Sequence, residues 1–191
     1  MRMGTSTEAV PRIGVVLAGG RSSRMGRDKA LLSWQGRPLL EHQLDTLHAT
    51  GVDTVRVSGD RPAYGGIADP VAGVGPLGGL AGIAAACGDA ELLIVPVDMP
   101  RLQPALLQRL LHAATAAGST HFEGHVLPMR LRLDEHCRSA LAALMDGSDE
   151  RARSLRALQQ RVGASSLPLN AAEEAQLIDC NTEQTWREAC R

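Results

Sequence analysis

The chain alternates between short apolar stretches and longer stretches in which leucine or alanine recurs at helical spacing. Three stretches consist mostly of apolar or β-branched residues, as is typical of strands buried on both faces of a sheet: residues 13–18, 54–58 and 91–97. Three other stretches have a proline at or just before their first turn, as helices often do. The first is residues 38–50, ended by Gly51, and the second is residues 77–87, after Pro76. The third begins at Pro104 and is stopped by Gly118. This order predicts an α/β fold, a single three-layer domain with a mostly parallel sheet and helices on both faces.

The pattern is looser beyond residue 118. Residues 126–133 are expected to form one strand or one arm of a hairpin, and residues 177–180 a short late strand. Side chains that suit helix N-caps predict three further helices, capped by Asp134, by Ser148 or Asp149, and by Asn181 or Thr182. No linker divides the chain, so residues 13–191 are expected to form one domain and residues 1–12 a flexible tail.

Composition excludes several classes of function. The 191 residues carry a formal net charge of −1, the pI is about 6.6, and 2% of the residues are aromatic. Nucleic-acid surfaces need a basic face or aromatic stacking platforms, so no nucleic acid is expected as a partner. No apolar run is long enough to span a bilayer and no secretory signal opens the chain, so no membrane is expected either. The four cysteines form no Cys-x-x-Cys pair, which favours reduced thiols in a cytoplasmic protein.

The end of the first predicted strand is rich in glycine and positive charge. Gly19 and Gly20 end the strand, and charged residues follow directly: Arg21, Arg24, Arg27, Asp28 and Lys29. Four cations less one anion leave a local charge of +3. Flexible glycine backbone and concentrated cations suit a polyphosphate, and the alternative is a solvated basic turn. The segment is no Walker loop, because Lys29 follows no glycine and precedes no serine or threonine.

Two aspartates are candidates for chemistry. Asp98 ends the strand 91–97, where a carboxylate needs a cation or hydrogen bonds. A magnesium ion bridging Asp98 to phosphate is one interpretation, and a turn aspartate before Pro100 is the other. Asp69 alone is typical of a turn. Because ligands bind at the carboxyl ends of parallel strands, Gly19, Ser58 and Asp98 are expected to meet at one edge of the sheet.

Residues 73–78 match the dinucleotide-binding pattern G-x-G-x-x-G. We interpret the match as a decoy, because no long strand precedes it and Pro76 removes an amide that phosphates would need. The glycines instead favour either a close approach of loop and helix to a flat ligand or close packing of the helix. An oxidoreductase that binds NAD through these residues stays as an alternative.

The glycine-rich segment resembles a known signature. Leu17-Ala-Gly-Gly-Arg-Ser-Ser-Arg-Met-Gly26, followed by Asp28-Lys29, resembles the motif of nucleotidyltransferases with a Rossmann-like α/β fold, above all the molybdenum cofactor guanylyltransferase family. Later landmarks of that family follow in order: residues 36–39, Asp69, residues 75–77, residues 98–100 and residues 181–183. The resemblance is strong over residues 13–102 and thin over 103–176. It implies a nucleotide-binding part at 13–102 and an acceptor-binding part at 103–191.

The resemblance also implies an activity. The family transfers GMP from GTP to the terminal phosphate of molybdopterin, with magnesium as cofactor and pyrophosphate as second product. The implied partners are GTP and molybdopterin, or its molybdenum-loaded form, together with molybdenum-insertion proteins and client molybdoenzyme chaperones. The alternatives are a cytidylyltransferase or a sugar-phosphate nucleotidyltransferase of the same superfamily, and an accessory protein that binds GTP without turnover.

Site residues follow from the same resemblance, position by position. The implied nucleotide-binding residues are Leu17, Ala18, Gly19, Gly20, Lys29, Ser58, Asp69 and Asp98, and the implied catalytic residues are Arg24, Lys29 and Asp98, with Asp98 as the metal ligand. Ser58 stands where the family often has asparagine, and a hydroxyl has less reach than an amide. Residues 179–182 resemble the family's Asn-x-Asn-Thr segment, and residues 125–128 are the only counterpart of its His-Pro segment on the pterin side.

Overall fold

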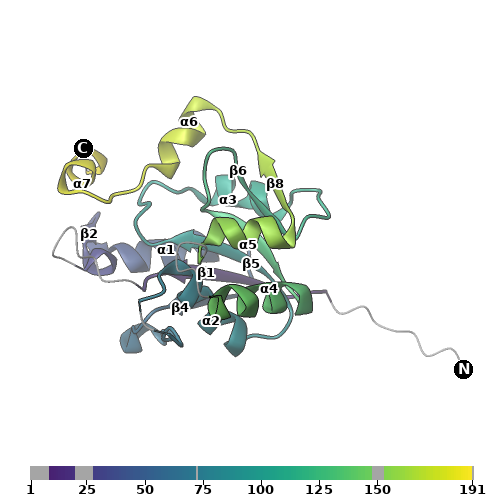
Figure 1. Cartoon of the computed structure of the whole chain (residues 1–191). Helices are drawn as coiled ribbons and strands as arrows, with labels where there is room; N and C mark the ends of the chain where they lie inside the picture. Colours follow the sequence, from purple (N-terminus) through teal and green to yellow (C-terminus); the bar gives the residue numbers. More distant parts are fainter. Residues whose placement is uncertain (1–8, 20–27, 72, 148–152, 191) are drawn as a thin grey trace, which may run out of the picture.

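A six-stranded sheet runs through the middle of the molecule (Figure 1). The computed structural model describes residues 9–19, 28–71, 73–147 and 153–190. The strands of the sheet are β1 (Arg12–Leu17), β4 (Thr54–Ser58), β5 (Ala90–Pro96), β6 (Ser119–Phe122), β7 (Met129–Leu133) and β8 (Ala164–Leu167), in the order β4-β1-β5-β7-β6-β8. β1 pairs in parallel with β4 and β5, β8 pairs in parallel with β6, and β7 is antiparallel to both of its neighbours. The sheet is therefore mostly parallel, which confirms the predicted fold class.

The central strands are apolar because the sheet is covered on both faces. Along β1, Val15 and Leu17 enter one core while Val16 enters the other, and all three are buried. Along β5, Ile94 and Val95 divide between the two cores in the same way. Alternating side chains of a strand point to opposite faces, so a strand with a core on each side reads as one continuous apolar run.

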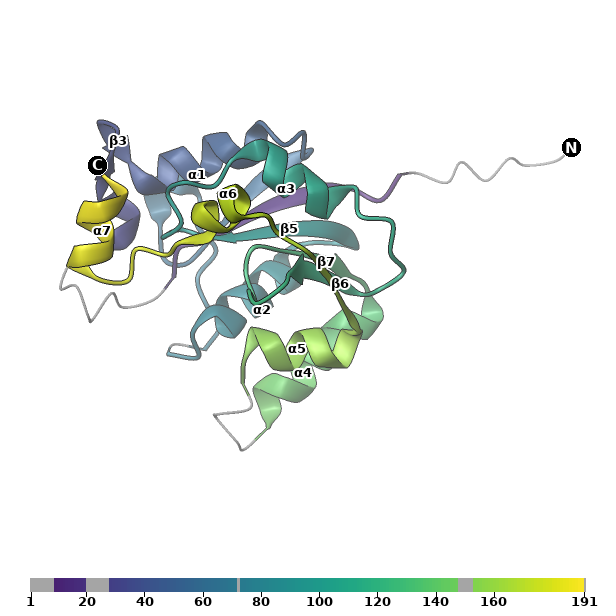
Figure 2. The same ribbon diagram turned by 90° about the horizontal axis from the view of Figure 1, so that it is seen from above.

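Helices cover the two faces of the sheet (Figure 2). One face is covered by α2 (Pro76–Ala86), α4 (Glu135–Asp146) and α5 (Leu155–Val162), and the other by α1 (Leu39–His48) and α3 (Pro104–Leu111). In α3 the leucines at 106, 107, 110 and 111 are all buried, which is the spacing of one helix face. Within the described residues, no helix combines the length and the apolar character needed to cross a membrane.

The last helix packs against a small hairpin from the first third of the chain. The hairpin is β2 (Ser33–Trp34) with β3 (Arg37–Pro38), and the helix is α7 (Glu183–Ala189). The rings of Trp34 and Trp186 meet edge to face with centroids 5.9 Å apart, and Arg101 Nη2 donates to the carbonyls of Glu188 and Ala189. Both figures show α7 beside this hairpin. The shorter elements are η1 (Lys29–Leu31), η2 (Pro62–Tyr64), α6 (Ala171–Glu174) and η4 (Ala175–Leu177).

Most predicted elements lie within one or two residues of their expected bounds, and two of the predicted caps are present. Asp134 caps α4, where its Oδ1 accepts a hydrogen bond from the backbone N–H of Cys137 at 2.9 Å. Thr182 caps α7 with its hydroxyl. The strand predicted at 54–58 has those bounds. Of the stretch expected as a tail, residues 1–8 lie outside the described part, and β1 begins at Arg12.

Three other predictions are wrong. Residues 177–180 form no strand, because Leu177 ends the turn η4 and the residues after it lead into α7. The cap of α5 is Ser154 rather than Ser148 or Asp149, both of which lie outside the described residues. Helix α3 ends at Leu111, well before Gly118, and the strands β6 and β8 were not expected. Their sequences, Ser-Thr-His-Phe and Ala-Ser-Ser-Leu, are too short and polar for periodicity to mark them.

Candidate functional site

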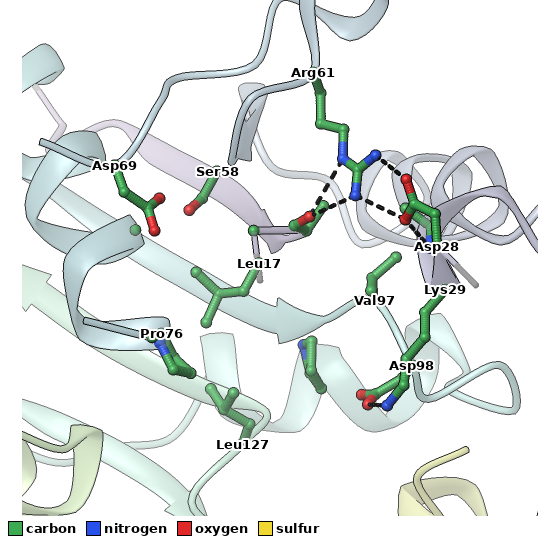
Figure 3. Close-up of a pocket in the computed structure, with 16 residues that line it drawn as sticks. Leu17, Asp28, Lys29, Ser58, Arg61, Asp69, Pro76, Val97, Asp98 and Leu127 are labelled. Carbon is green, nitrogen blue, oxygen red and sulfur yellow. Dashed lines mark hydrogen bonds and ion pairs between the residues drawn. The ribbon is translucent and has the colours of Figure 1, made fainter. Parts of the chain in front are cut away.

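A pocket lies at the carboxyl ends of β1, β4 and β5 (Figure 3). It brings together the described residues that the sequence assigned to a nucleotide: Leu17, Ala18, Gly19, Lys29, Ser58, Asp69 and Asp98. The ends of three parallel strands contribute Leu17, Ala18, Gly19, Ser58 and Asp98, whereas Lys29 lies in η1 and Asp69 in the loop before α2. Gly20 and Arg24 were assigned to the same site and lie outside the described residues, so their roles stay predictions.

A lysine and an aspartate meet on one side of the pocket. Lys29 Nζ lies 2.9 Å from Asp98 Oδ2, and the side chains are 14% and 18% exposed. The same ammonium donates to Asn181 Oδ1, and the backbone N–H of Cys180 donates to the Asp98 carbonyl at 2.8 Å. The segment before α7 therefore closes this side of the pocket and fixes the backbone of Asp98.

An arginine lies between two neighbouring segments of the pocket wall. Arg61 follows β4 and reaches the carbonyl of Ala18 with Nε at 3.3 Å and with Nη2 at 3.1 Å. Its Nη2 also donates to Asp28 Oδ1 at 2.8 Å, and its Nη1 donates to Asp28 Oδ2. Asp28 in turn caps η1, because its Oδ1 accepts from the backbone N–H of Ala30 at 3.1 Å. The turn that carries Lys29 is thus anchored to Arg61.

The other side of the pocket holds a carboxylate that is shielded from water. Asp69 Oδ1 is buried and has no hydrogen-bond partner among the described residues. Loss of water around the carboxylate raises the pKa of Asp69 above its ordinary value. A buried acceptor without a donor is costly, so this oxygen is available to a ligand that brings an N–H or O–H.

The first turn of α2 approaches this carboxylate closely. A Cβ atom added to Gly79 would lie 2.1 Å from Ser58 Oγ and 3.2 Å from Asp69 Oδ1. Gly75 precedes α2 with φ +72°, a conformation that favours glycine. Pro76 opens the helix and lines the pocket with Gly75 and Gly79. Gly79 therefore brings the backbone of α2 close to Ser58 and Asp69, and the interpretation of residues 73–78 as a decoy stays a prediction.

Sequence reasoning assigned no role to several residues in or beside the pocket. Arg61 and Leu127 line it, and Asn181 contacts Lys29. Asn181 lies in a segment quoted for the resemblance, and Arg61 follows the second strand end directly, so both positions carried a signal. Two residues of the segment 125–128 have different contacts. Leu127 lines the pocket, whereas His125 Nε2 lies 2.7 Å from Glu174 Oε1.

The comparisons with known proteins agree with this geometry. The MobA-like NTP transferase domain matches residues 14–164. A molybdenum cofactor guanylyltransferase from Xanthomonas euvesicatoria pv. vesicatoria is 52% identical over 177 residues, which cover 92% of this chain and 93% of that protein.

Solved structures have the same fold. The molybdopterin-guanine dinucleotide biosynthesis protein A of Archaeoglobus fulgidus has a TM-score of 0.69 at 19% identity, over 93% of this chain and 96% of that one. A manganese complex of a Mycobacterium tuberculosis protein has a TM-score of 0.61 at 20% identity, over 93% and 97%.

Together, the fold and these relatives define an enzyme of the nucleotidyltransferase class. The predicted family is confirmed by the domain match and by the 52% identity. The chain belongs to the molybdenum cofactor guanylyltransferases.

Proposed function

We propose that this enzyme transfers GMP from GTP to the terminal phosphate of molybdopterin and releases pyrophosphate. The observation that carries the proposal is the contact of Lys29 with Asp98 in a pocket that Gly19, Ser58 and Asp69 also line. Such a pocket offers an ammonium for phosphate oxygens and a carboxylate for a metal ion. It also offers a second, separate carboxylate for the nucleoside.

The triphosphate lies, in this proposal, along the ends of β1 and η1. The backbone of Leu17, Ala18 and Gly19 lines that part of the pocket, and Lys29 supplies a positive charge. Lysine acts on phosphate as a point charge that can follow the shifting negative charge of the reaction. Arg24 is proposed to add a second cation, on the strength of the resemblance alone.

Guanosine lies, in this proposal, on the opposite side of the pocket. Asp69 Oδ1 lacks a donor among the described residues, and a guanosine N–H or O–H group would supply one. Ser58 is 1% exposed and its hydroxyl faces the same space beside Gly79. A short side chain fits there, because the helix backbone approaches so closely.

Magnesium is the proposed cofactor, and the residues present suit it. Among the residues that the structure describes, no three His, Cys, Asp or Glu side chains are grouped as a metal site. Mg²⁺ commonly binds through one or two carboxylates together with substrate phosphates, so the single carboxylate of Asp98 fits a site that the triphosphate completes. The manganese complex of the Mycobacterium tuberculosis neighbour supports a divalent ion. When bound, the ion neutralises charge on the reacting phosphates.

The proposed reaction needs no strong base, because the acceptor phosphate is already an anion. One of its oxygens forms a bond to the α-phosphorus of GTP. The bond from that phosphorus to the bridging oxygen breaks, and the electron pair leaves with pyrophosphate. The work of the chain is to hold two anions together, so Lys29 contributes by electrostatic stabilisation.

Pyrophosphate release tests the proposal directly. Purified protein is incubated in parallel reactions with magnesium, molybdopterin and one nucleotide: GTP, CTP or UTP. Pyrophosphate release is expected only in the reaction that contains GTP. Release with CTP would assign the cytidylyl branch instead. Binding of GTP without release in the presence of molybdopterin would assign the accessory role.

A ligand-binding measurement separates the nucleotides without turnover. A ligand at a hundred times its dissociation constant adds about 2.7 kcal/mol to stability, so GTP with magnesium is expected to raise the melting temperature. NAD is expected to leave it unchanged. Asp98→Asn is expected to abolish the response of GTP binding to magnesium, and Arg37→Ala, which removes an exposed ion pair with Asp45, is the matched control.

A further inference from the structure

Arg61 joins the two ends of a single stretch of chain. Ala18 directly precedes residues 19–27, and Asp28 directly follows them. The guanidinium contacts both: two of its nitrogens donate to the Ala18 carbonyl, and two donate to the Asp28 carboxylate (Figure 3). One side chain from a different strand end therefore bridges the two ends of this stretch.

The hydrogen bonds of Arg61 are almost all used within the protein. A guanidinium has five N–H groups in a fixed plane. Four of them donate to Ala18 and Asp28, among the residues that the structure describes. A side chain so occupied acts through the groups that it holds, although it lines the pocket.

The backbone that carries Arg61 is also held firmly. The Arg61 carbonyl accepts from the N–H groups of Tyr64 and Gly66, each at 2.9 Å, and the N–H of Gly59 donates to the Ile67 carbonyl at 2.8 Å. A Cβ atom added to Gly66 would lie 2.7 Å from Arg61 Cβ. The loop after β4 therefore presents the guanidinium from a closely packed base.

The consequence reaches Lys29 through Asp28. Asp28 Oδ1 accepts from both Arg61 Nη2 and the N–H of Ala30, so the ion pair and the first turn of η1 share one oxygen. Lys29 is the first residue of that turn, and its ammonium faces Asp98. The backbone position from which Lys29 reaches Asp98 is therefore linked to Arg61 through the Asp28 carboxylate.

We propose that Arg61 is a positioning residue of the nucleotidyl transfer reaction: by binding Ala18 and Asp28 together, it sets where the Lys29 ammonium stands. The inference rests on the proposed function for its effect on turnover, but the anchoring of η1 can be measured without any substrate. A 1 Å misplacement of a reacting group costs up to about a hundredfold in rate. We expect Arg61→Ala to lower kcat/KM for GTP about tenfold to a hundredfold.

Chemical rescue distinguishes positioning from direct phosphate binding. Guanidinium ion at millimolar concentration is added to Arg61→Ala, to Asp28→Asn and to the double variant. If Arg61 acts through Asp28, the ion restores part of the kcat/KM of Arg61→Ala and restores nothing in the double variant. If Arg61 binds phosphate directly, rescue is the same with and without the Asp28 carboxylate, and the proposal is overturned.

The variants also form a double-mutant cycle. Because the two residues act as one unit, the loss of kcat/KM in the double variant is expected to be no larger than the loss in the more impaired single variant. The proposal would be overturned if the loss of kcat/KM in the double variant equalled the product of the two single losses. It would also be overturned if the kcat/KM of Arg61→Ala lay within twofold of the wild-type value. Arg61→Lys is expected to keep only part of the activity, since an ammonium cannot bridge a carbonyl and a carboxylate in the same plane. Arg37→Ala is the control for loss of an exposed arginine.

Hydrogen exchange separates failure of this inference from failure of the proposed function. In the protein without ligands, deuterium uptake by the peptide containing Ala30 and Leu31 is expected to accelerate at least threefold in Arg61→Ala. Unchanged deuterium uptake would exclude the anchoring of η1 by Arg61, even if the protein turns over GTP. A wild-type protein that turns over no GTP would refute the proposed function while this measurement still decides the anchoring.

Discussion

The ammonium of Lys29 and the carboxylate of Asp98 lie 2.9 Å apart, although 69 positions separate them in the chain. In the proposed reaction, the ammonium would bind a phosphate oxygen and the carboxylate would bind a metal ion. In the protein alone they neutralise each other in a partly buried setting, where an unpaired charge would be costly. In the proposed complex, a metal-bound triphosphate would take over both halves of this pair.

Removal of the lysine tests its part in the reaction. Lys29→Ala is expected to raise the barrier by about 3 kcal/mol, or about a hundredfold in kcat, as for loss of one charge-stabilising donor. Pyrophosphate release under saturating GTP and magnesium measures the effect. Full turnover in this variant would exclude a catalytic role for Lys29. Arg37→Ala is expected to keep wild-type activity.

A methyl group on α2 tests the close approach of the helix to the nucleoside side of the pocket. In Gly79→Ala the new Cβ would collide with Ser58 Oγ at 2.1 Å, so a loss of about 1–3 kcal/mol in stability and weaker GTP binding are expected. Ser58→Ala removes the colliding oxygen and leaves its Cβ at 3.4 Å from the added methyl. The double variant should therefore regain most of the stability in urea unfolding. If it does not, the approach is not limited by Ser58.

The raised pKa of Asp69 gives a pH dependence with a definite sign. Burial raises the pKa above its ordinary value near 3.8, so the folded protein binds more protons than the unfolded chain between the two pKa values. Stability contributed by this group therefore falls as pH rises through that window, and the penalty is complete above it. Asp69→Asn should gain more stability over wild type at about pH 7 than at about pH 4, measured by urea unfolding. An equal gain at both values would exclude a penalty from ionisation.

The cap of α4 offers a change in stability that leaves the pocket untouched. Asp134 accepts a hydrogen bond from the N–H of Cys137 at the start of α4, far from the nucleotide-binding residues in sequence. Asp134→Ala is expected to cost about 1 kcal/mol, because one N–H of the first turn loses its acceptor. Thermal unfolding measures the cost, and kcat should be unchanged at 25 °C or thereabouts. A large loss of kcat would mean that α4 shapes the pocket.

The sequence predicted those elements whose physical cause is local. The two-sided burial of β1 and β5 appears as an unbroken apolar run, and caps such as Asp134 and Thr182 need only a side chain and the turn that follows it. β6 and β8 were not predicted, because each strand is four residues long and their backbone hydrogen bonds are made with each other and with β7. Such pairing is a tertiary effect that no local pattern records.

The sequence likewise predicted some residues of the site and missed others. The residues that the structure brings to the pocket had been assigned by strand ends and by a motif, since parallel topology carries separate strand ends to one edge. Arg61 and Asn181 were missed because their roles depend on contacts across 33 and 152 positions. A side chain whose partners are the carbonyl of Ala18 and the carboxylate of Asp28, both distant in sequence, has no signature in its own neighbourhood.

The edge-to-face pair of Trp34 and Trp186 gives this enzyme a built-in optical probe. The chain contains two tryptophans, and both lie at the junction of the C-terminal helix with the β2–β3 hairpin. Intrinsic fluorescence excited at the indole band therefore reports from that one place. Asn181, which contacts Lys29, lies just before the same helix. Emission from an unlabelled sample can thus follow the docking of the C-terminal segment in real time.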